Sequence, residues 1–325
     1  MRRPRLRRDG DGRLRVALTV VTLLLVVVVW GALLLRAGEW TAQWLLVGVA
    51  LVHYVLWLAP VAVLLAVLNR RLVTAGVAAL ATVLVLVVQV PPTVSRDAAA
   101  SRDGITVLQA NLKIGAADPV ALVRRVRDED VDLLATEELT TAAASGLVAA
   151  GLPKLLPYRY LRPLRDGGSG SGIWSRWPLS GTQDVPGFYL STVRARVASP
   201  RGPLTFVAVH LTPPWPFPAW RWVDEMGRLR ALLREQPRDA PVIAAGDYNA
   251  TVDHAQFRAL LAGGYTDAAD DAGAGYLRSY PADRWYGPVI AIDHVLLCGV
   301  TGVSADTLDL PGSDHRALLV RTTAP

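Results

Sequence analysis

Three long apolar runs occupy the first 90 residues and constrain the fold more than any other feature of the sequence. They extend over Val16 to Leu35, Trp44 to Leu68 and Leu72 to Val90, and only His53 and Pro60 interrupt the second. A helix needs about 20 apolar residues to cross the hydrocarbon core of a bilayer, and each run is close to that length. The sequence therefore predicts a membrane-integral anchor over residues 1–90, with three transmembrane helices at about 16–35, 44–68 and 72–90.

The placement of arginines predicts the orientation of this anchor. Seven arginines precede the first run and two separate the second from the third, whereas the first loop offers a single arginine beside Glu39. Cytoplasmic loops carry the excess of positive charge, so we expect the N-terminus in the cytoplasm and everything after Val90 outside the cytoplasmic membrane. A cleaved signal peptide is the alternative for the first run, but its apolar stretch is too long and no cleavage site follows it. The arginines are Arg2, Arg3, Arg5, Arg7, Arg8, Arg13, Arg15, Arg36, Arg70 and Arg71.

The positive charge of the chain belongs to the anchor. Residues 1–90 hold ten arginines and three acidic residues, which gives +7, while the whole chain of 325 residues has a net charge of +6. Residues 91–325 therefore carry a net charge of −1. Nucleic-acid-binding domains normally present a basic face, so we do not expect nucleic acid as a partner. No protein partner is evident from the sequence.

Residues 91–104 have the Pro, Ser and Asp content of a linker, and residues 105–325 form the predicted extracytoplasmic domain. Apolar segments of this domain alternate between strand-like and helix-like patterns. Because hairpin and crossover connections are mixed, we predict a two-sheet α/β sandwich and not a doubly wound parallel sheet. The expected strands are 105–111, 131–138, 171–175, 192–198, 204–210, 241–245, 289–292, 292–297 and 316–320; the expected helices are 119–128, 219–236 and one capped by Asp253 that ends near 262.

Polar motifs stand at the ends of these predicted strands. Three of them are Gly246-Asp247-Tyr248-Asn249, Ile292-Asp293-His294 and Gly312-Ser313-Asp314-His315. Hydrolysis of a phosphate ester requires a cation for the equatorial oxygens, a positioned water and charge stabilisation. Carboxylate and amide oxygens suit Mg²⁺, and they suit Mn²⁺ as well. Further polar side chains at strand ends are Asn111, Glu138 and His210.

In their order along the chain, these motifs resemble those of the endonuclease/exonuclease/phosphatase superfamily, which includes DNase-I-like nucleases, neutral sphingomyelinases and inositol polyphosphate 5-phosphatases. The resemblance covers the whole predicted domain. It implies a four-layer α/β/β/α sandwich with a Mg²⁺ site at one end of the two sheets. Besides the three motifs above, it rests on Gln109-Ala-Asn111, Glu137-Glu138-Leu139, Ser171 to Pro178 and Val209-His210-Leu211.

The resemblance also implies the ligands of the metal ion. Glu138 would anchor the ion, Asn111 would help it, and Asp314 would complete the coordination shell. Glu137 stands where the family usually has Gln. Since neighbours on a strand point to opposite faces, we assign Glu138 to the site and Glu137 elsewhere.

The remaining motif residues take catalytic roles by the same resemblance. Asp247 would activate or orient the attacking water, and Asn249 would hold the phosphate. His315 would stabilise the pentavalent transition state, and Asp293 would fix its tautomer. His210 would donate to a phosphoryl oxygen, although the acid that orients this histidine in several relatives is not identifiable in the sequence.

An aromatic segment follows His210 directly. Four prolines and four aromatic residues alternate there, and tryptophan favours a boundary between water and lipid, while proline stiffens a loop. We expect this loop to meet the outer leaflet and to receive a lipid-linked phosphate. The alternative is that the aromatic residues pack against the following helix. They are Trp215, Phe217, Trp220 and Trp222.

Three predicted spans followed by such a domain resemble a narrower group, the teicoplanin-resistance-associated membrane proteins, which are regarded as undecaprenyl pyrophosphate phosphatases. This resemblance implies a Mg²⁺-dependent phosphohydrolase that acts on a lipid pyrophosphate in cell-envelope metabolism. Two alternatives remain open from the sequence. One is a phosphodiesterase, either sphingomyelinase-like or an extracellular nuclease, and the other is a non-catalytic membrane interaction module.

Overall fold

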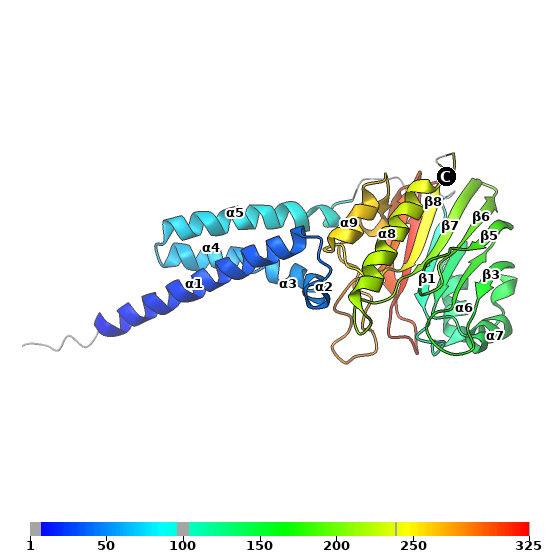
Figure 1. Cartoon of the computed structure of the whole chain (residues 1–325), viewed down its shortest axis with the longest axis horizontal. Helices are drawn as coiled ribbons and strands as arrows, with labels where there is room; N and C mark the ends of the chain where they lie inside the picture. The colour runs from blue at the N-terminus through cyan, green and yellow to red at the C-terminus, as the bar shows by residue number, and fades with distance from the viewer. Residues whose placement is uncertain (1–7, 96–103, 238, 325) are drawn as a thin grey trace, which may run out of the picture. The chain divides into compact units, whose positions relative to one another are not determined.

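The structure is a computed structural model that describes residues 8–95, 104–237 and 239–324 (Figure 1). The chain divides into two compact units. The first, which we call the helical unit, comprises the chain up to Glu39 together with Gly48–Val90. The second, which we call the sandwich unit, comprises Trp40–Val47 together with the chain from Pro91 onward.

Five apolar helices account for the anchor region. Two stretches, Gly12–Ala37 and Leu72–Gln89, are long and apolar enough to cross a membrane. The run over 44–68 is instead a pair of helical segments bent by 58°, so the described residues hold two candidate spans, or three if the bent pair is one span. The count of three membrane spans therefore stays a prediction. The helices are α1 (Arg8–Ala37), α2 (Gln43–Ala50), α3 (Val52–Leu56), α4 (Ala59–Leu68) and α5 (Leu72–Gln89).

Small side chains form the buried surfaces of α4 and α5, which pack against each other. Alanine allows helices in a membrane to approach closely. The turn between these helices is also held to the start of α1, because Asn69 Nδ2 donates to the carbonyl of Arg15 at 3.2 Å and to Thr19 Oγ1 at 2.6 Å. The start of α1 and the Arg70–Arg71 turn therefore lie at the same end of the helical unit. The buried alanines are Ala59, Ala62, Ala66, Ala75, Ala78 and Ala81.

The sandwich unit contains two six-stranded mixed sheets, which confirms the predicted two-sheet α/β class. The first sheet has the strand order β11-β12-β1-β2-β4-β3 and the second has the order β5-β6-β7-β8-β10-β9. The strands are β1 (Thr106–Asn111), β2 (Leu133–Glu137), β3 (Tyr158–Arg162), β4 (Ser171–Ser175), β5 (Leu179–Asp184), β6 (Val193–Ser199), β7 (Gly202–His210), β8 (Val242–Asp247), β9 (Thr266–Asp267), β10 (Asp293–Cys298), β11 (Gly302–Leu308) and β12 (Ala317–Thr322).

Three apolar clusters hold this unit together as four layers (Figure 1). The inner cluster fills the space between the sheets, with Val107 and Ile173 from the first sheet and Phe206 and Ile243 from the second. Alternation along each strand directs the other side chains outward, where helices cover them. Helices α6 (Pro119–Asp128) and α7 (Thr141–Ala149) cover the first sheet, and α8 (Ala219–Glu235) and α9 (Ala255–Leu261) cover the second.

Parallel pairing brings the polar strand ends together. Strands β1 and β2 run parallel with Asn111 opposite Glu137, and β7 and β8 run parallel with His210 opposite Asp247. Strand β10 is antiparallel to β8 and begins at Asp293, opposite Asp247. All these residues therefore lie at one end of the two sheets.

Local sequence signals explain some boundaries and miss others. The predicted helix over 119–128 is confirmed, and the Asp118 side chain caps it by accepting from two backbone N–H groups. Residues 289–292 do not form the expected strand; Ile290 makes only an isolated bridge to Tyr280. Asp253 does not cap α9, because His254 occupies that position and is buried.

Candidate active site

Three buried side chains meet at this end of the sandwich. Asp247, Asp293 and His315 each offer a possible ligand atom, and these atoms lie within 4.8 Å of one another. Asp247 ends β8, Asp293 begins β10 and His315 precedes β12, so the chain brings together three separate segments. Two carboxylates and an imidazole thus share one buried volume.

The imidazole of His315 is positively charged in this cluster. Its Nδ1 donates to Asp293 Oδ2 at 2.8 Å, and its Nε2 lies 3.8 Å from Asp247 Oδ2. Burial alone would lower the pKa of His315, but the two carboxylates outweigh burial and raise the pKa to about 10. The contact with Asp293 also fixes the orientation of the ring, as expected for a cation that stabilises developing negative charge.

Asp247, unlike His315, has a pKa close to neutral pH. Burial and the nearby charge of Asp293 raise the pKa of Asp247 to about 7, so this carboxylate can take up a proton near neutral pH. Its Oδ1 accepts from the backbone N–H of Asn249 at 2.8 Å. Asn249 itself has a positive φ of 48°, and its side-chain nitrogen donates to the carbonyl of Leu211 at 2.8 Å. The Asn249 backbone thus orients the Asp247 carboxylate.

His210 is neutral. Burial and the charge of His315 lower the pKa of His210 to about 3, and its Nε2 lies 4.0 Å from Asp247 Oδ2. Among the described residues, Nδ1 of His210 has no hydrogen-bond partner. No carboxylate of the described chain therefore orients this ring, and Nε2 is the nitrogen that faces the cluster.

Glu138 lies beside the cluster in a constrained conformation. Its φ is 53°, a left-handed value that is uncommon for a residue with a side chain. Glu138 Oε1 accepts from Asn111 Nδ2 at 3.2 Å, and the same amide nitrogen donates to Asp247 Oδ2 at 3.2 Å. Burial raises the pKa of the Glu138 carboxyl, and the charge of the nearby Asp314 adds to this rise. The Asn111 amide therefore bridges two carboxylates that would otherwise repel each other.

Behind His315, the interior of the sandwich holds a chain of polar contacts that the sequence did not reveal. Gln109 Nε2 donates to Asp293 Oδ1 at 2.7 Å and to Glu137 Oε2 at 2.8 Å. Glu137 is wholly buried, and burial together with the charge of Asp293 raises its pKa well above the usual range. Glu137 is thus joined to Asp293 through Gln109 and lies behind the cluster, whereas Glu138 lies beside it. Gln109 and Asn111 lie two positions apart on β1 and so share a strand face, which is the signal that could have indicated Gln109.

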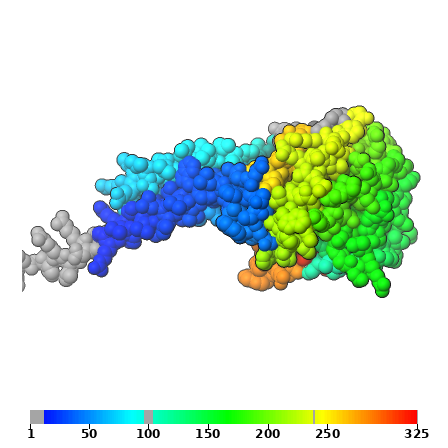
Figure 2. All heavy atoms as spheres, in the orientation of Figure 1, coloured from blue at the N-terminus to red at the C-terminus, as the bar shows by residue number. Residues whose placement is uncertain are grey.

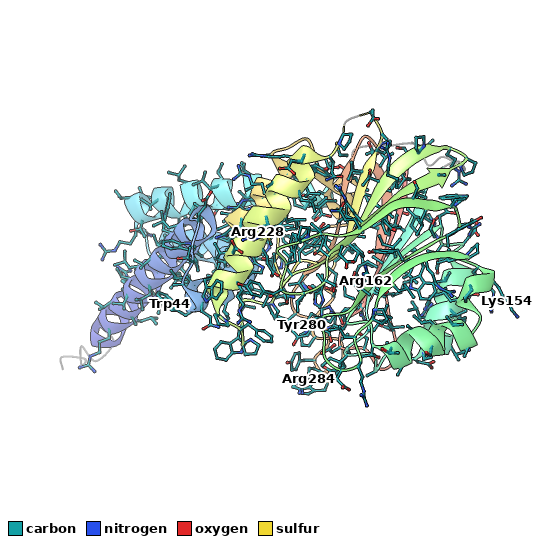
Figure 3. The ribbon with its side chains drawn as sticks, turned by 45° about the vertical axis from the view of Figure 1, so that its right-hand side comes forward. Trp44, Lys154, Arg162, Arg228, Tyr280 and Arg284 are labelled. Carbon is teal, nitrogen blue, oxygen red and sulfur yellow. The ribbon has the colours of Figure 1, made fainter. Side chains whose placement is uncertain are left out.

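A loop after Tyr280 forms one wall of the site and was also missed. The ring of Tyr280 lies 4.9 Å from the ring of His315, and the backbone N–H of Ala282 donates to the carbonyl of Asp314 at 2.6 Å. Tyr280 and Arg284 lie at the same end of the unit in Figure 3, and the orange segment with this loop protrudes in Figure 2. The loop carries two exposed aromatic residues, Trp285 and Tyr286, which are the signal in its sequence that could have indicated it.

The aromatic segment after His210 divides into two parts. Trp215, Phe217 and Trp220 are 66%, 44% and 56% exposed. Trp222 is wholly buried, and its Nε1 donates to the carbonyl of Tyr248 at 3.1 Å. Trp222 is therefore a core residue of α8 and not part of the predicted substrate loop. For this residue the alternative, packing with the helix, holds.

The geometry can now be compared with known proteins. Residues 108–315 match the model of the Endonuclease/Exonuclease/phosphatase family. The chain belongs to this family. Its members hydrolyse phosphoester bonds with the help of divalent metal ions. No curated protein matches the chain.

Solved structures of the family share the fold at low identity. The chain is similar to D. rerio TDP2 complexed with single strand DNA product, with 19% identity, 68% of this chain and 99% of that one covered, and a TM-score of 0.57. It is also similar to a mannosyl-6-phosphatase from Bacteroides thetaiotaomicron, with 17% identity, 67% and 99% coverage and a TM-score of 0.54. These likenesses show the DNase-I-like fold alone. Because one neighbour carries DNA, the comparisons do not support the expectation that nucleic acid is excluded.

The residues present fit the divalent metal ion that the family uses. Asp247 lies close to Asp293, and the charge of Glu138 also acts on Asp247, so a cation would relieve the repulsion that helps to raise the pKa of Asp247. His315 could ligate only after losing its proton, whereas Glu138 offers hard oxygen atoms. The Asn111 amide turns its nitrogen toward Glu138, and its Oδ1 accepts from the backbone of Lys113 at 2.9 Å. Direct ligation by Asn111 would require this amide to turn over.

Proposed function

We propose that this chain is a membrane-anchored, metal-dependent phosphohydrolase that works outside the cytoplasmic membrane on a lipid-linked pyrophosphate, with undecaprenyl pyrophosphate as the leading candidate. The activity would belong to cell-envelope metabolism and would fit a role in glycopeptide resistance. One observation carries the proposal. The buried cluster of Asp247, Asp293 and His315 adjoins His210, and an exposed aromatic loop follows His210 directly in a chain that begins with apolar helices.

In this proposal the charged groups divide the chemistry between them. Asp247, with a pKa of about 7, orients the attacking water and takes its proton. His315, with a pKa of about 10, remains a cation and stabilises the charge that develops on the phosphoryl oxygens. His210 donates from Nε2 to one of these oxygens, and Asn249 keeps Asp247 in place.

In this proposal the metal ion would bind among the carboxylates beside Asp247. Glu138 and Asp314 would hold the ion, with Asn111 between Glu138 and Asp247. A bound Mg²⁺ or Mn²⁺ would neutralise negative charge on the phosphate group. The oxygen donors do not distinguish these two ions.

The placement of arginines in the helical unit supports an active site outside the cytoplasmic membrane. The start of α1 and the turn between α4 and α5 share one end of the helical unit, and arginines stand at both places. Excess positive charge belongs to the cytoplasmic side. A periplasm-active reporter fused after Pro325 should therefore be active. If only a reporter that works in the cytoplasm were active, a substrate outside the cytoplasmic membrane would be excluded.

The substrate is tested with the full chain in lipid nanodiscs. Mg²⁺-dependent release of phosphate from undecaprenyl pyrophosphate should be lost in Asp247→Ala and His315→Ala. Asp224→Ala, which removes a surface partner of Arg228, is the matched control and should keep full activity.

Sphingomyelin and single-stranded DNA serve as the competing substrates. If either of these is cleaved and the pyrophosphate is not, with the same dependence on Asp247, the chain is a phosphodiesterase and not a lipid pyrophosphatase. If no substrate were cleaved by the wild-type chain with Mg²⁺ or Mn²⁺, a non-catalytic membrane module would become the better account.

A further inference from the structure

The connection between the first two apolar helices belongs to the sandwich unit. Residues Trp40–Val47 group with the chain from Pro91 onward and not with the helices on either side of them. Leu46 is 1% exposed and lies in the same apolar cluster as Trp222 and Phe257. The core behind α8 and α9 is therefore completed by a residue that precedes the domain by about 60 positions in the sequence.

Two polar side chains of the sandwich fasten this segment further. Gln256 Nε2 donates to the carbonyl of Trp40 at 2.6 Å, and His254 Nε2 lies 3.0 Å from the carbonyl of Leu46. The Nδ1 of the same histidine accepts from the backbone N–H of Thr251 at 3.0 Å, which leaves Nε2 as the donor to Leu46. Both ends of the segment are thus bound to the start of α9.

The segment in turn holds the aromatic loop. The amide nitrogen of Gln43 donates to the carbonyl of Pro214 at 2.8 Å and to the carbonyl of Phe217 at 2.9 Å. These are two well-formed hydrogen bonds from one side chain, and they reach across more than 170 positions of the sequence. The two acceptor carbonyls stand on either side of Trp215 in the sequence, and the Trp215 side chain remains exposed.

The loop needs a hydrogen-bond donor from outside, such as the Gln43 amide, because it has few backbone N–H groups of its own. Four of its residues from 213 to 218 are prolines, which carry no backbone N–H, so the loop cannot close itself with backbone hydrogen bonds. At its start, Thr212 N–H donates to Glu225 Oε2 at 2.7 Å, which fixes only the first residue. The middle of the loop is fixed by Gln43.

We propose that Gln43 is a positioning residue that sets the conformation of the exposed aromatic loop beside His210, and so affects the presentation of a lipid-linked phosphate. The inference rests on the proposed function for the identity of the substrate, but the contact between Gln43 and the loop stands apart from it. The residue acts through Trp215 and Phe217 and touches no catalytic group.

The sharpest test replaces Gln43 by its isosteric acid in the full chain. In Gln43→Glu the side chain keeps its shape but loses both N–H donors and faces two carbonyl oxygens with a negative charge. Gln43→Lys keeps a donor and should restore the loop. Gln183→Glu is the matched control, because Gln183 only accepts from Arg194 and a carboxylate can do the same.

The first readout does not depend on catalysis. A spin label is attached at Phe217→Cys in a Cys298→Ala background, in nanodiscs of phosphatidylethanolamine and phosphatidylglycerol. We expect an ordered spectrum with Gln43, a mobile one with Gln43→Glu, and an ordered one with Gln43→Lys and with Gln183→Glu. Equal mobility in all four proteins would overturn the inference.

The second readout separates the inference from the proposed function. With undecaprenyl pyrophosphate in the same nanodiscs, Gln43→Glu should raise KM about tenfold while kcat stays within about twofold, since each lost hydrogen bond is worth about 0.5–1.5 kcal/mol. Cleavage by the wild-type chain with an unchanged KM in Gln43→Glu would refute the role of Gln43 in presentation. A wild-type chain that cleaves no pyrophosphate would refute the proposed substrate, and the spin-label result would still decide the role of Gln43 in the loop.

Discussion

The Nδ1 atom of His315 lies 2.8 Å from Oδ2 of Asp293, and this carboxylate, together with Asp247, keeps a positive charge on the imidazole. Without Asp293, burial would favour the neutral imidazole. The acid thus determines the charge of the histidine as well as its orientation. The same acid is held from behind by Gln109.

Asp293→Asn should therefore change the pH profile as well as the rate. We expect kcat to fall about 10²-fold, which is the lower range for loss of a positioned acid–base group. Because the pKa of His315 would drop from about 10 toward its ordinary value, the residual activity should decline as the pH rises from 6 to 8, whereas the wild type keeps its cation there. Initial rates over this pH range measure the effect. A variant profile parallel to that of the wild type would contradict it.

Glu138→Gln should weaken metal binding at least about tenfold, in the range seen when metal-site carboxylates are altered. The stabilisation of the folded protein by added Mg²⁺ or Mn²⁺ in a thermal melt reports this affinity without any substrate. Glu129→Gln is the control, since Glu129 pairs with Arg321 away from the site. Equal metal-dependent shifts in Glu138→Gln and the wild type would exclude Glu138 as a ligand.

Glu137→Gln should stabilise the protein more at high pH than at low pH. The pKa of buried Glu137 is raised, so the folded state binds a proton that the unfolded state releases above about pH 4.5. The contribution of Glu137 to stability is fully present below its unfolded pKa and is lost as the pH rises through the folded pKa. Gln needs no proton, so the gain in Tm of Glu137→Gln over wild type should be larger at pH 8 than at pH 5. A gain that is the same at both values would argue against a buried protonated acid.

Gly246→Ala should disrupt the sandwich. An added methyl group would overlap the backbone carbonyl of Val209, in the strand that pairs with β8 in parallel, and would displace Asp247 and His210 together. We expect a loss of at least about 3 kcal/mol, typical of overpacking against an unyielding backbone. Gly227→Ala in α8 is the contrast, because its methyl group meets no atom within 4 Å and should add up to about 1 kcal/mol of helix stability. Urea denaturation of both variants measures the difference.

The sequence was sufficient for the two-sheet class and for several residues at the strand ends, but it missed β3, β5, β9 and β11. Asn111, His210, Asp247 and Asp293 could be found because each ends or begins an apolar strand, and parallel pairing then places such ends together. Helix α6 was predictable from a different local signal, an aspartate that caps the helix followed by a proline in its first turn. These features depend on residues within a few positions of each other.

What escaped prediction depends on distant contacts. His254 takes the cap position expected for Asp253, and its ring is buried beside Leu46, whose carbonyl lies 3.0 Å from its Nε2. Trp222 has the same sequence context as the exposed Trp220, and only the helical phase on α8 turns it inward. Glu137 is buried because β2 lies in the middle of its sheet, which the local pattern does not show.

The position of β12 has a consequence for the synthesis of the chain. Strand β12 inserts between β11 and β1, and His315 stands just before it, so β1 obtains its second neighbour only after residues 317–322 have been made. The candidate active site therefore cannot assemble before His315 and β12 have left the ribosome, and a chain truncated before His315 should be inactive.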